Sequence, residues 1–385
     1  MRAQHPFALI ACLAAASCTR KDSPATEAPS LVPTAAAAAP SPIGTGSAEP
    51  KAGAKQTMAT SYRLMGRFVR EPNGNAWRMA WPGTAMVARF KGTSISIRIK
   101  DEGFSLFQVI VDGELKKVLR TDKAKDVYVL AEGLTDAQHD VVVERRTEAK
   151  VGETVFFGFE PGPGAVMLAP PAAPDRRIEI IGDSISTGYG NEGPGAACGY
   201  VNSQQNEYLS YGAITARNLE ADHSTIAWSG KTLYEMREYF DKSLPARDDA
   251  PRWDFAQWQP HVVVLNVGTN NFANIDPGEK RFLELYQALF AKVRAAYPKA
   301  FVVCALGPML SDVYPEGRHN LTQARKYMKV VMQKLDESGE KNTAFLEFPE
   351  QNHADGLGCG FHPSLKTHKL MSDRLTALLK ERMGW

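Results

Sequence analysis

Four short blocks in the second half of the chain carry residue types that together can perform acyl transfer. Ser184 stands in "GDSIS", directly after an apolar run, and His362 stands in "GFHPS" near the C-terminal end. Between them lie Gly230, in "WSGK", and Asn270, in "GTNN". A serine hydroxyl becomes an effective nucleophile only when a base takes its proton, and an imidazole can be that base. We therefore predict that Ser184 is the nucleophile and that His362 is its base.

Gly230 and Asn270 suit a second requirement of this chemistry, which is stabilisation of the oxyanion that forms when serine attacks a carbonyl. The backbone N–H groups of Ser184 and Gly230 and the side-chain amide of Asn270 could supply three donors. Removing one such donor typically costs about 10²–10³ in rate. Each block alone is common in turns, so the prediction depends on the four occurring together and in this order.

The elements that must position these blocks follow a proline-rich joint at 169–177. From there apolar strands alternate with amphipathic helices, a pattern typical of a parallel sheet covered on both faces. Right-handed crossovers place all the carboxyl ends of such strands at one edge, where ligands bind. We expect strands at 178–182, 224–228, 262–268, 301–307 and 344–348, and helices at 279–297, 322–336 and 364–382. The four blocks follow the first, second, third and fifth of these strands.

Residues 60–168 show a period of two instead, with expected strands at 94–100, 107–113, 127–131, 140–146 and 155–160. The pair Asp112-Gly113 predicts a tight hairpin turn. No segment here has a convincing helical repeat. We expect a small antiparallel sandwich of the jelly-roll kind.

The N-terminal residues 1–17 are typical of a secretion signal, with small residues ending at Cys18. Lipidation of Cys18 is the favoured interpretation, which would place the protein in the periplasm or on the cell surface; simple secretion is the alternative. Residues 18–58, rich in Ala, Pro, Ser and Thr, are expected to be a disordered linker. In an exported protein, a disulfide between Cys198 and Cys359 is a reasonable hypothesis, whereas Cys304 lies in an apolar run and is expected in the core.

The four blocks resemble those of the SGNH (GDSL-type) hydrolases. A jelly roll ahead of "GDSISTGYG", the stretch from Tyr208 to Gly212 before a helix, and the "HP" motif at His362 are together similar to carbohydrate esterase family 2, over about residues 60–385. The resemblance implies an α/β fold: a five-stranded parallel, doubly wound, flavodoxin-like domain at 175–385 preceded by an all-β jelly-roll domain at 59–170. It also implies removal of O-acetyl groups from polysaccharide or oligosaccharide, through an acetyl-serine intermediate, without a metal or cofactor.

Two positions depart from the wider SGNH pattern. Many members have Asp three residues before the histidine, where this chain has Cys359. Either a backbone carbonyl therefore orients His362, or a carboxylate such as Asp355 does; a Ser–His dyad is the favoured interpretation. Asn271 replaces a usual Asp, and we expect that position to be structural.

Aromatic residues border the proposed site and could stack on sugar rings. Trp228, Tyr189 and Phe361 are the candidates for substrate binding, with Tyr200 beside them, although core packing suits Trp228 equally well. Trp77 and Trp81 in the first half could form a sugar platform or belong to the sandwich core, and the core is favoured.

The other titratable residues receive structural interpretations. We expect Asp183 to cap backbone N–H groups and His368 to pack, while His353 is a weak competitor for the base. Surface or capping roles are expected for the rest, which are His139, His223, His261 and His319. A metal site needs several ligands at short spacing, and no such cluster is apparent.

Composition narrows the function classes. The net charge of +2, with acids and bases interspersed, does not favour nucleic-acid binding, and after the N-terminus no apolar stretch is long enough to span a membrane. We expect a monomer. Two alternatives to the carbohydrate esterase stay open: a lipase or thioesterase of the GDSL type, and a non-catalytic glycan-binding protein.

Overall fold

Five apolar runs form a parallel sheet in the computed structural model, which describes residues 61–385. The expected signal, linker and lipidation at Cys18 lie outside the described residues. The strand order is β13-β12-β14-β15-β16, a doubly wound flavodoxin-like order, and this confirms the expected fold. The strands agree with the sequence prediction to within three residues at each end. They are β12 (Arg176–Gly182), β13 (Ala221–Ala227), β14 (Val262–Asn266), β15 (Phe301–Leu306) and β16 (Thr343–Glu347).

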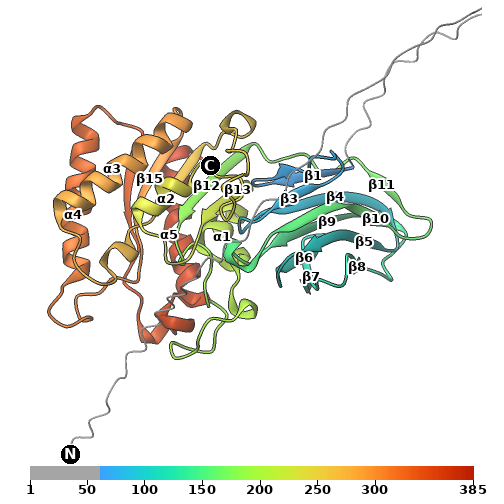
Figure 1. Ribbon diagram of the computed structural model, residues 1–385, viewed down its shortest axis with the longest axis horizontal. Helices are drawn as coiled ribbons and strands as arrows, with labels where there is room; N and C mark the ends of the chain where they lie inside the picture. Colours follow the sequence, from blue (N-terminus) through green and yellow to red (C-terminus); the bar gives the residue numbers. More distant parts are fainter. Residues whose placement is uncertain (1–60) are drawn as a thin grey trace, which may run out of the picture. The chain divides into compact units, whose positions relative to one another are not determined.

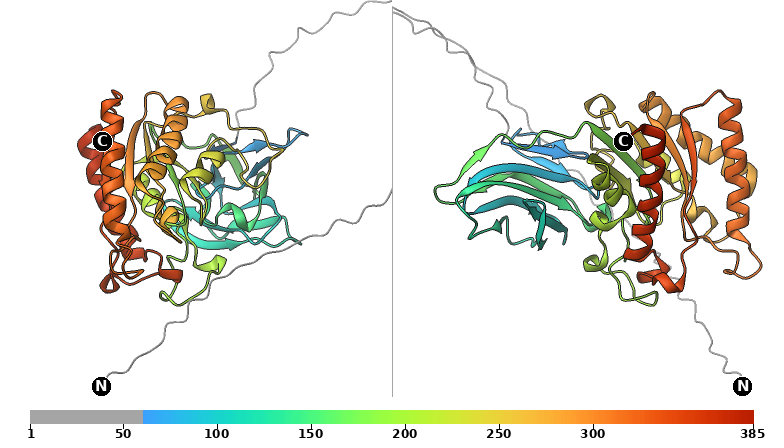
Figure 2. Two further views of the ribbon diagram at one scale, coloured as in Figure 1. Left: turned by 60° about the vertical axis from the view of Figure 1, so that its left-hand side comes forward. Right: turned by 180° about the vertical axis from the view of Figure 1, so that it is seen from behind.

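Helices cover both faces of this sheet because alternate strand residues point to opposite sides. Val263 and Leu265 belong to the core formed with α2 (Leu233–Tyr239), α3 (Glu279–Ala296) and α4 (Asn320–Glu337). Val262 and Val264 belong to the core formed with α1 (Tyr211–Asn218) and α5 (Leu365–Met383). Figure 1 and Figure 2 show these two layers on either side of the sheet. We call residues 176–385 the α/β part.

Residues 62–168 form two antiparallel sheets that pack face to face, which we call the N-terminal sandwich (Figure 1). One sheet has the order β1-β4-β9-β6-β7, with β11 beside β4, and the other has the order β2-β3-β10-β5-β8. The strands are β1 (Tyr62–Met65), β2 (Val69–Arg70), β3 (Trp77–Met79), β4 (Ala85–Gly92), β5 (Ile95–Asp101), β6 (Leu106–Val111), β7 (Glu114–Arg120), β8 (Val127–Ala131), β9 (Ala137–Arg145), β10 (Thr154–Pro161) and β11 (Val166–Leu168). Asp112 and Gly113, both at positive φ, form the predicted hairpin turn between β6 and β7.

The sandwich and the α/β part share a buried junction. Trp81 is fully buried in the core of the α/β part, and its indole N–H donates to the carbonyl of Lys242 at 3.1 Å. Trp81 is therefore a core residue, as favoured, but in the core of the α/β part rather than in that of the sandwich. Trp77 is half-buried on β3, and its indole N–H donates to the hydroxyl of Tyr62 at 3.1 Å.

The junction also contains a buried ion pair. Arg67 of the sandwich lies 3.3 Å from the Glu179 carboxylate on β12, and both side chains are buried. The hydroxyl of Tyr297 donates to the same carboxylate at 2.9 Å, and the Arg67 guanidinium also lies over the rings of Phe240, Trp253 and Phe255. Burial raises the pKa of Glu179, and the nearby Arg67 opposes that rise. None of the helices in the described part of the chain has the length and apolarity that crossing a membrane requires.

Candidate active site

Ser184 lies in the turn that follows β12, at the carboxyl edge of the parallel sheet. The turn is tight. A Cβ at Gly182 would stand 2.0 Å from the Ser186 hydroxyl oxygen, so only glycine fits there. The Asp183 carboxylate accepts the backbone N–H of Ile185 at 3.1 Å, and this confirms the predicted capping role. Burial raises the pKa of Asp183 to about 7.

His362 faces Ser184 across this edge. Its Nε2 lies 2.8 Å from the Ser184 hydroxyl oxygen, and its Nδ1 lies 3.1 Å from the carbonyl oxygens of both Cys359 and Gly360. Two acceptors at Nδ1 favour the tautomer with its proton there, which leaves Nε2 free to accept the serine proton. Burial lowers the pKa of His362 to about 4, so the ring is neutral at pH 7.

The candidate carboxylate Asp355 does not orient this ring. Its side chain pairs with Lys366 at 2.6 Å and accepts the Asn352 side-chain amide at 2.7 Å. In residues 61–385, the hydrogen-bond partners of His362 Nδ1 are therefore backbone carbonyls. His353 lies in an exposed 3-10 turn, His353–Asp355, whereas His362 is the histidine that contacts the Ser184 hydroxyl.

The two oxyanion candidates follow the strands on either side of β12 at the same edge, Gly230 in a turn and Asn270 in a 3-10 helix (Thr269–Phe272). Gly230 follows β13 with φ +80°, a conformation that favours glycine. Asn270 follows β14, and its amide nitrogen lies 3.0 Å from the Lys231 carbonyl and 3.4 Å from the Asp183 carboxylate. To donate to the oxyanion, the Asn270 amide would therefore have to give up its 3.4 Å contact with the Asp183 carboxylate. Asn271 accepts the backbone N–H of Leu233 at 3.0 Å, a structural role at the start of α2.

The sandwich contributes two residues to this edge that sequence reasoning missed. Glu148 is fully buried, and its carboxylate accepts the backbone N–H of Ser229 at 2.7 Å. The Lys150 ammonium lies 3.0 Å from that carboxylate and 3.7 Å from the centre of the Tyr200 ring. Both residues lie far along the chain from the four blocks and stand in no recognisable motif. Their position could therefore not be predicted from the sequence.

The aromatic candidates take different positions. Tyr189 lies between Tyr200 and His362, at ring-centroid distances of 4.8 Å and 4.2 Å. Phe361 is exposed beside His362, at a positive φ of 61°. Trp228 is half-buried and packs against the core. It also lines a pocket of about 490 Å³, together with Glu102, Ala149, Lys150, Gly152, Glu153, Ala246 and Arg247.

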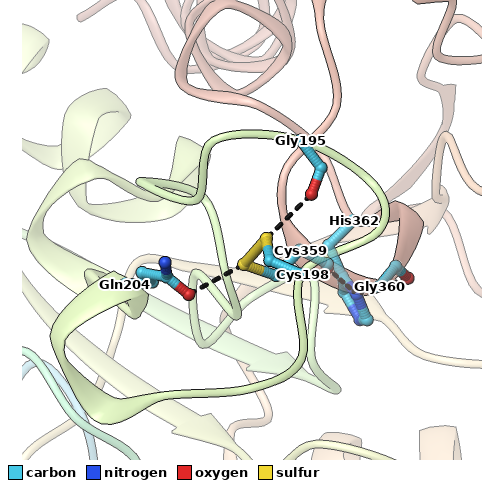
Figure 3. The surroundings of a disulfide bond; sticks show 6 residues. All are labelled: Gly195, Cys198, Gln204, Cys359, Gly360 and His362. Atoms are coloured by element: carbon cyan, nitrogen blue, oxygen red, sulfur yellow. Dashed lines mark hydrogen bonds between the residues drawn. A yellow bond between two sulfur atoms is a disulfide. The ribbon is translucent and has the colours of Figure 1, made fainter.

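A disulfide joins Cys198 to Cys359, which confirms the sequence hypothesis (Figure 3). It attaches the loop after Ser184 to the loop that carries His362. The backbone N–H of Cys359 also donates to the Gly190 carbonyl at 2.9 Å, which joins the same two loops. Cys304 is buried and free, as predicted.

Two of the histidine interpretations are wrong. His139 is buried, and its Nδ1 lies 2.7 Å from the Asp112 carboxylate. His223 is buried near two glutamates. The prediction of surface or capping roles failed because these carboxylates come from other elements. His368 accepts the backbone N–H of Tyr211 inside the core, as expected for a packing role. His261 and His319 are exposed.

Comparison with family models and known proteins identifies relatives of both parts of the chain. The model described as "Carbohydrate esterase 2 N-terminal" matches residues 64–171, and the model of the "GDSL-like Lipase/Acylhydrolase family" matches residues 180–370. The cellulase/esterase CelE of Acetivibrio thermocellus is 38% identical over 330 residues, which cover 83% of this chain. This chain spans only 39% of the length of that relative. An acetylxylan esterase / glucomannan deacetylase of Cellvibrio japonicus is 28% identical, with 86% of this chain and 94% of the relative covered.

Solved structures extend the match to the full described fold. A family two carbohydrate esterase from Clostridium thermocellum, in complex with cellohexaose, is 37% identical with a TM-score of 0.80. The alignment covers 84% of this chain and 99% of that structure. A family 2 enzyme from Corynascus thermopiles (Myceliophthora fergusii), 28% identical, gives a TM-score of 0.75, with 84% of this chain and all of that one covered. The chain described here belongs to carbohydrate esterase family 2.

Proposed function

We propose that the protein is a serine esterase that removes O-acetyl groups from a polysaccharide or oligosaccharide. The observation that carries the proposal is the contact of 2.8 Å between the Ser184 hydroxyl and His362 Nε2. The names of the relatives support the substrate class, since they include acetylxylan esterase / glucomannan deacetylase and a family two esterase in complex with cellohexaose.

In the proposed reaction, His362 takes the proton of Ser184 as the hydroxyl oxygen attacks the acetyl carbonyl carbon. The backbone N–H groups of Ser184 and Gly230 and the Asn270 amide stabilise the tetrahedral oxyanion. Collapse breaks the bond to the sugar oxygen, which receives the proton from His362, and leaves acetyl-Ser184. Water then attacks this ester with His362 again as base, acetate departs, and the serine hydroxyl is restored. No metal or cofactor takes part.

The Ser184→Ala variant tests this proposal directly. It should fold normally and lose release of acetate from acetylated xylan and glucomannan, and also hydrolysis of p-nitrophenyl acetate. Activity at the wild-type level in a folded Ser184→Ala protein would refute the proposal. Ser203→Ala, at an exposed serine in a nearby loop, is the matched control and should retain full activity.

The two alternative functions are separated by simple measurements. A lipase or thioesterase would hydrolyse long acyl esters faster than acetyl esters, whereas the proposed enzyme should lose rate as the acyl chain lengthens. A non-catalytic glycan-binding protein would bind cellohexaose or xylan without releasing acetate.

We further propose that the chain is exported, anchored through Cys18 and monomeric, with domain boundaries near 59–170 and 175–385. The disulfide supports export, because such bonds persist in oxidising compartments. Mass spectrometry of the membrane fraction would reveal a lipid on Cys18, and light scattering would give the oligomeric state.

A further inference from the structure

A second cluster of ligand-type side chains lies at the junction of the sandwich and the α/β part. Glu144 is on β9, Glu207 begins a short 3-10 helix (Glu207–Leu209), and His223 is on β13. One possible ligand atom from each residue lies within 4.8 Å of the other two. All three residues are at least nine-tenths buried, with exposures of 4%, 0% and 3%. The cluster therefore links three elements of two different folds inside the protein.

The atoms that converge here have no hydrogen-bond partner in the described part of the chain. They are Oε1 of Glu144, Oε2 of Glu207 and Nε2 of His223. His223 Nε2 lies 3.5 Å from Oε1 of Glu207 and 4.0 Å from Oε1 of Glu144. Buried polar atoms are nearly always paired, and unpaired ones are unfavourable. Three buried residues with unpaired polar atoms and ligand atoms within 4.8 Å of one another are placed to share a ligand.

The surroundings fix the cluster and keep its centre clear of side chains. The Thr225 hydroxyl donates to Glu207 Oε1 at 2.7 Å, and the backbone N–H of Glu207 donates to the Arg146 carbonyl at 3.0 Å. Gly83 lies against the cluster with φ +72°. A Cβ at Gly83 would stand 2.9 Å from Glu207 Oε2 and 3.0 Å from His223 Nε2, so a larger residue would crowd the ligand atoms.

The donor set is that of a divalent cation. Two carboxylates and a neutral imidazole balance a charge of +2, and this mixture suits first-row ions such as Zn²⁺. Bonds of about 2.0–2.2 Å in a tetrahedral site place ligand atoms about 3.4 Å apart. The carboxylate oxygens that face His223 Nε2 are Glu207 Oε1 at 3.5 Å, which also accepts the Thr225 hydroxyl, and Glu144 Oε1 at 4.0 Å, so a bound ion would draw the ligands slightly together.

We propose that Glu144, Glu207 and His223 bind one first-row divalent cation, with Zn²⁺ favoured, and that this ion cross-links the sandwich to the α/β part. The site is structural and separate from the Ser184–His362 pair, which lies at the carboxyl edge of the sheet. The sequence shows no motif for this site because the three ligands are separated along the chain.

Metal analysis of the full chain tests the proposal without reference to esterase activity. The protein is unfolded with a chelator, refolded in excess ZnCl₂ or in chelator, and desalted. We expect about one zinc per chain after refolding in ZnCl₂. We also expect a Tm about 5 °C higher than that of the chelator-refolded protein when free ZnCl₂ is kept at roughly 100 times its Kd during the melt. Zinc below about 0.1 per chain with equal Tm values, and the same result with MnCl₂, would overturn the proposal.

Variants locate the ion. Glu207→Gln and His223→Asn should each lose the bound zinc and the zinc-dependent part of Tm. The matched control is His139→Asn, which removes another buried histidine paired with a carboxylate and should keep the zinc. If both cluster variants refold with a full equivalent of zinc, the ion binds elsewhere and the assignment is wrong. If a variant fails to fold, the zinc content and Tm of the unmodified chain still decide the question.

Discussion

The Glu148 carboxylate of the sandwich accepts a hydrogen bond of 2.7 Å from the backbone N–H of Ser229, the residue before Gly230. Glu148 is fully buried, so this hydrogen bond is shielded from water. It holds the loop that presents the Gly230 N–H to the proposed oxyanion. The sandwich thus contributes to the position of a group that the proposed mechanism uses.

Loss of this bond should slow the reaction. We expect Glu148→Ala to lower kcat for p-nitrophenyl acetate about 10²-fold with little change in KM, because a small misplacement of a catalytic group can cost that much. Glu148→Gln keeps an oxygen acceptor and should recover most of the rate. The control is Asp101→Asn, another buried sandwich carboxylate that accepts a backbone N–H, from Gly103 at 2.9 Å; it should leave kcat within about twofold. Wild-type kcat in a folded Glu148→Ala protein would contradict the positioning role.

The pKa of His362 predicts the acid side of the pH profile. The ring can act as a base only when neutral, and burial lowers its pKa to about 4. Activity should therefore persist as the pH falls below 6.5 and decline only near pH 4, in plots of kcat/KM for p-nitrophenyl acetate. Asp183, whose pKa is about 7, is the other group beside Ser184 to consider. A limb near pH 7 that disappears in Asp183→Asn would show that Asp183 controls the profile instead.

The structure predicts that Asp355 is dispensable for chemistry. Its carboxylate pairs with Lys366, and backbone carbonyls hold His362 Nδ1. We expect Asp355→Asn to keep kcat within about threefold, whereas loss of a triad aspartate costs about 10⁴. Steady-state kinetics on p-nitrophenyl acetate give the answer. A decrease of 10³-fold or more in a folded variant would mean that a carboxylate does orient the histidine.

The disulfide should matter for catalysis as well as for stability. Cys359 supplies one of the two carbonyls that orient His362, and its bond to Cys198 holds that loop in place. We expect the double variant Cys198→Ser/Cys359→Ser to lose about 2–4 kcal/mol of its free energy of unfolding and therefore to unfold at a lower temperature. We also expect it to have a reduced kcat. The control Cys304→Ala changes a buried free cysteine in β15 and should affect Tm without affecting kcat. An unchanged kcat in the double variant would show that the loop keeps its geometry unaided.

The sequence was sufficient for elements whose residues are apolar throughout. Strands such as "VVVLN" at Val262–Asn266 are buried on both faces, so composition alone identifies them. The short strands β1, β2, β3 and β11 were not predicted, because two to four residues carry too little periodicity. Strand β4, with eight residues, was also missed, because nearly all of its residues are buried and they do not alternate. Helix α2 was also missed, although Thr232 and Glu235 form a capping box at its start, a signal that could have revealed it.

The candidate site divides in the same way. Ser184, Gly230, Asn270 and His362 could be proposed because each follows a predicted strand, and strand polarity places them at one edge. Glu148 could not, since its contact with Ser229 depends on how the sandwich packs against the α/β part. The proximity of His223 to Glu144 and Glu207 could not be predicted for the same reason.

The buried pair of Arg67 and Glu179 makes the two halves of the protein depend on each other. Either half alone would contain a charged side chain without the partner that neutralises it. Losing one partner of such a buried pair typically costs about 3–5 kcal/mol of stability. The sandwich is thus no interchangeable accessory that could be shed or replaced like a tethered binding module. Separating the two halves should therefore destabilise both of them.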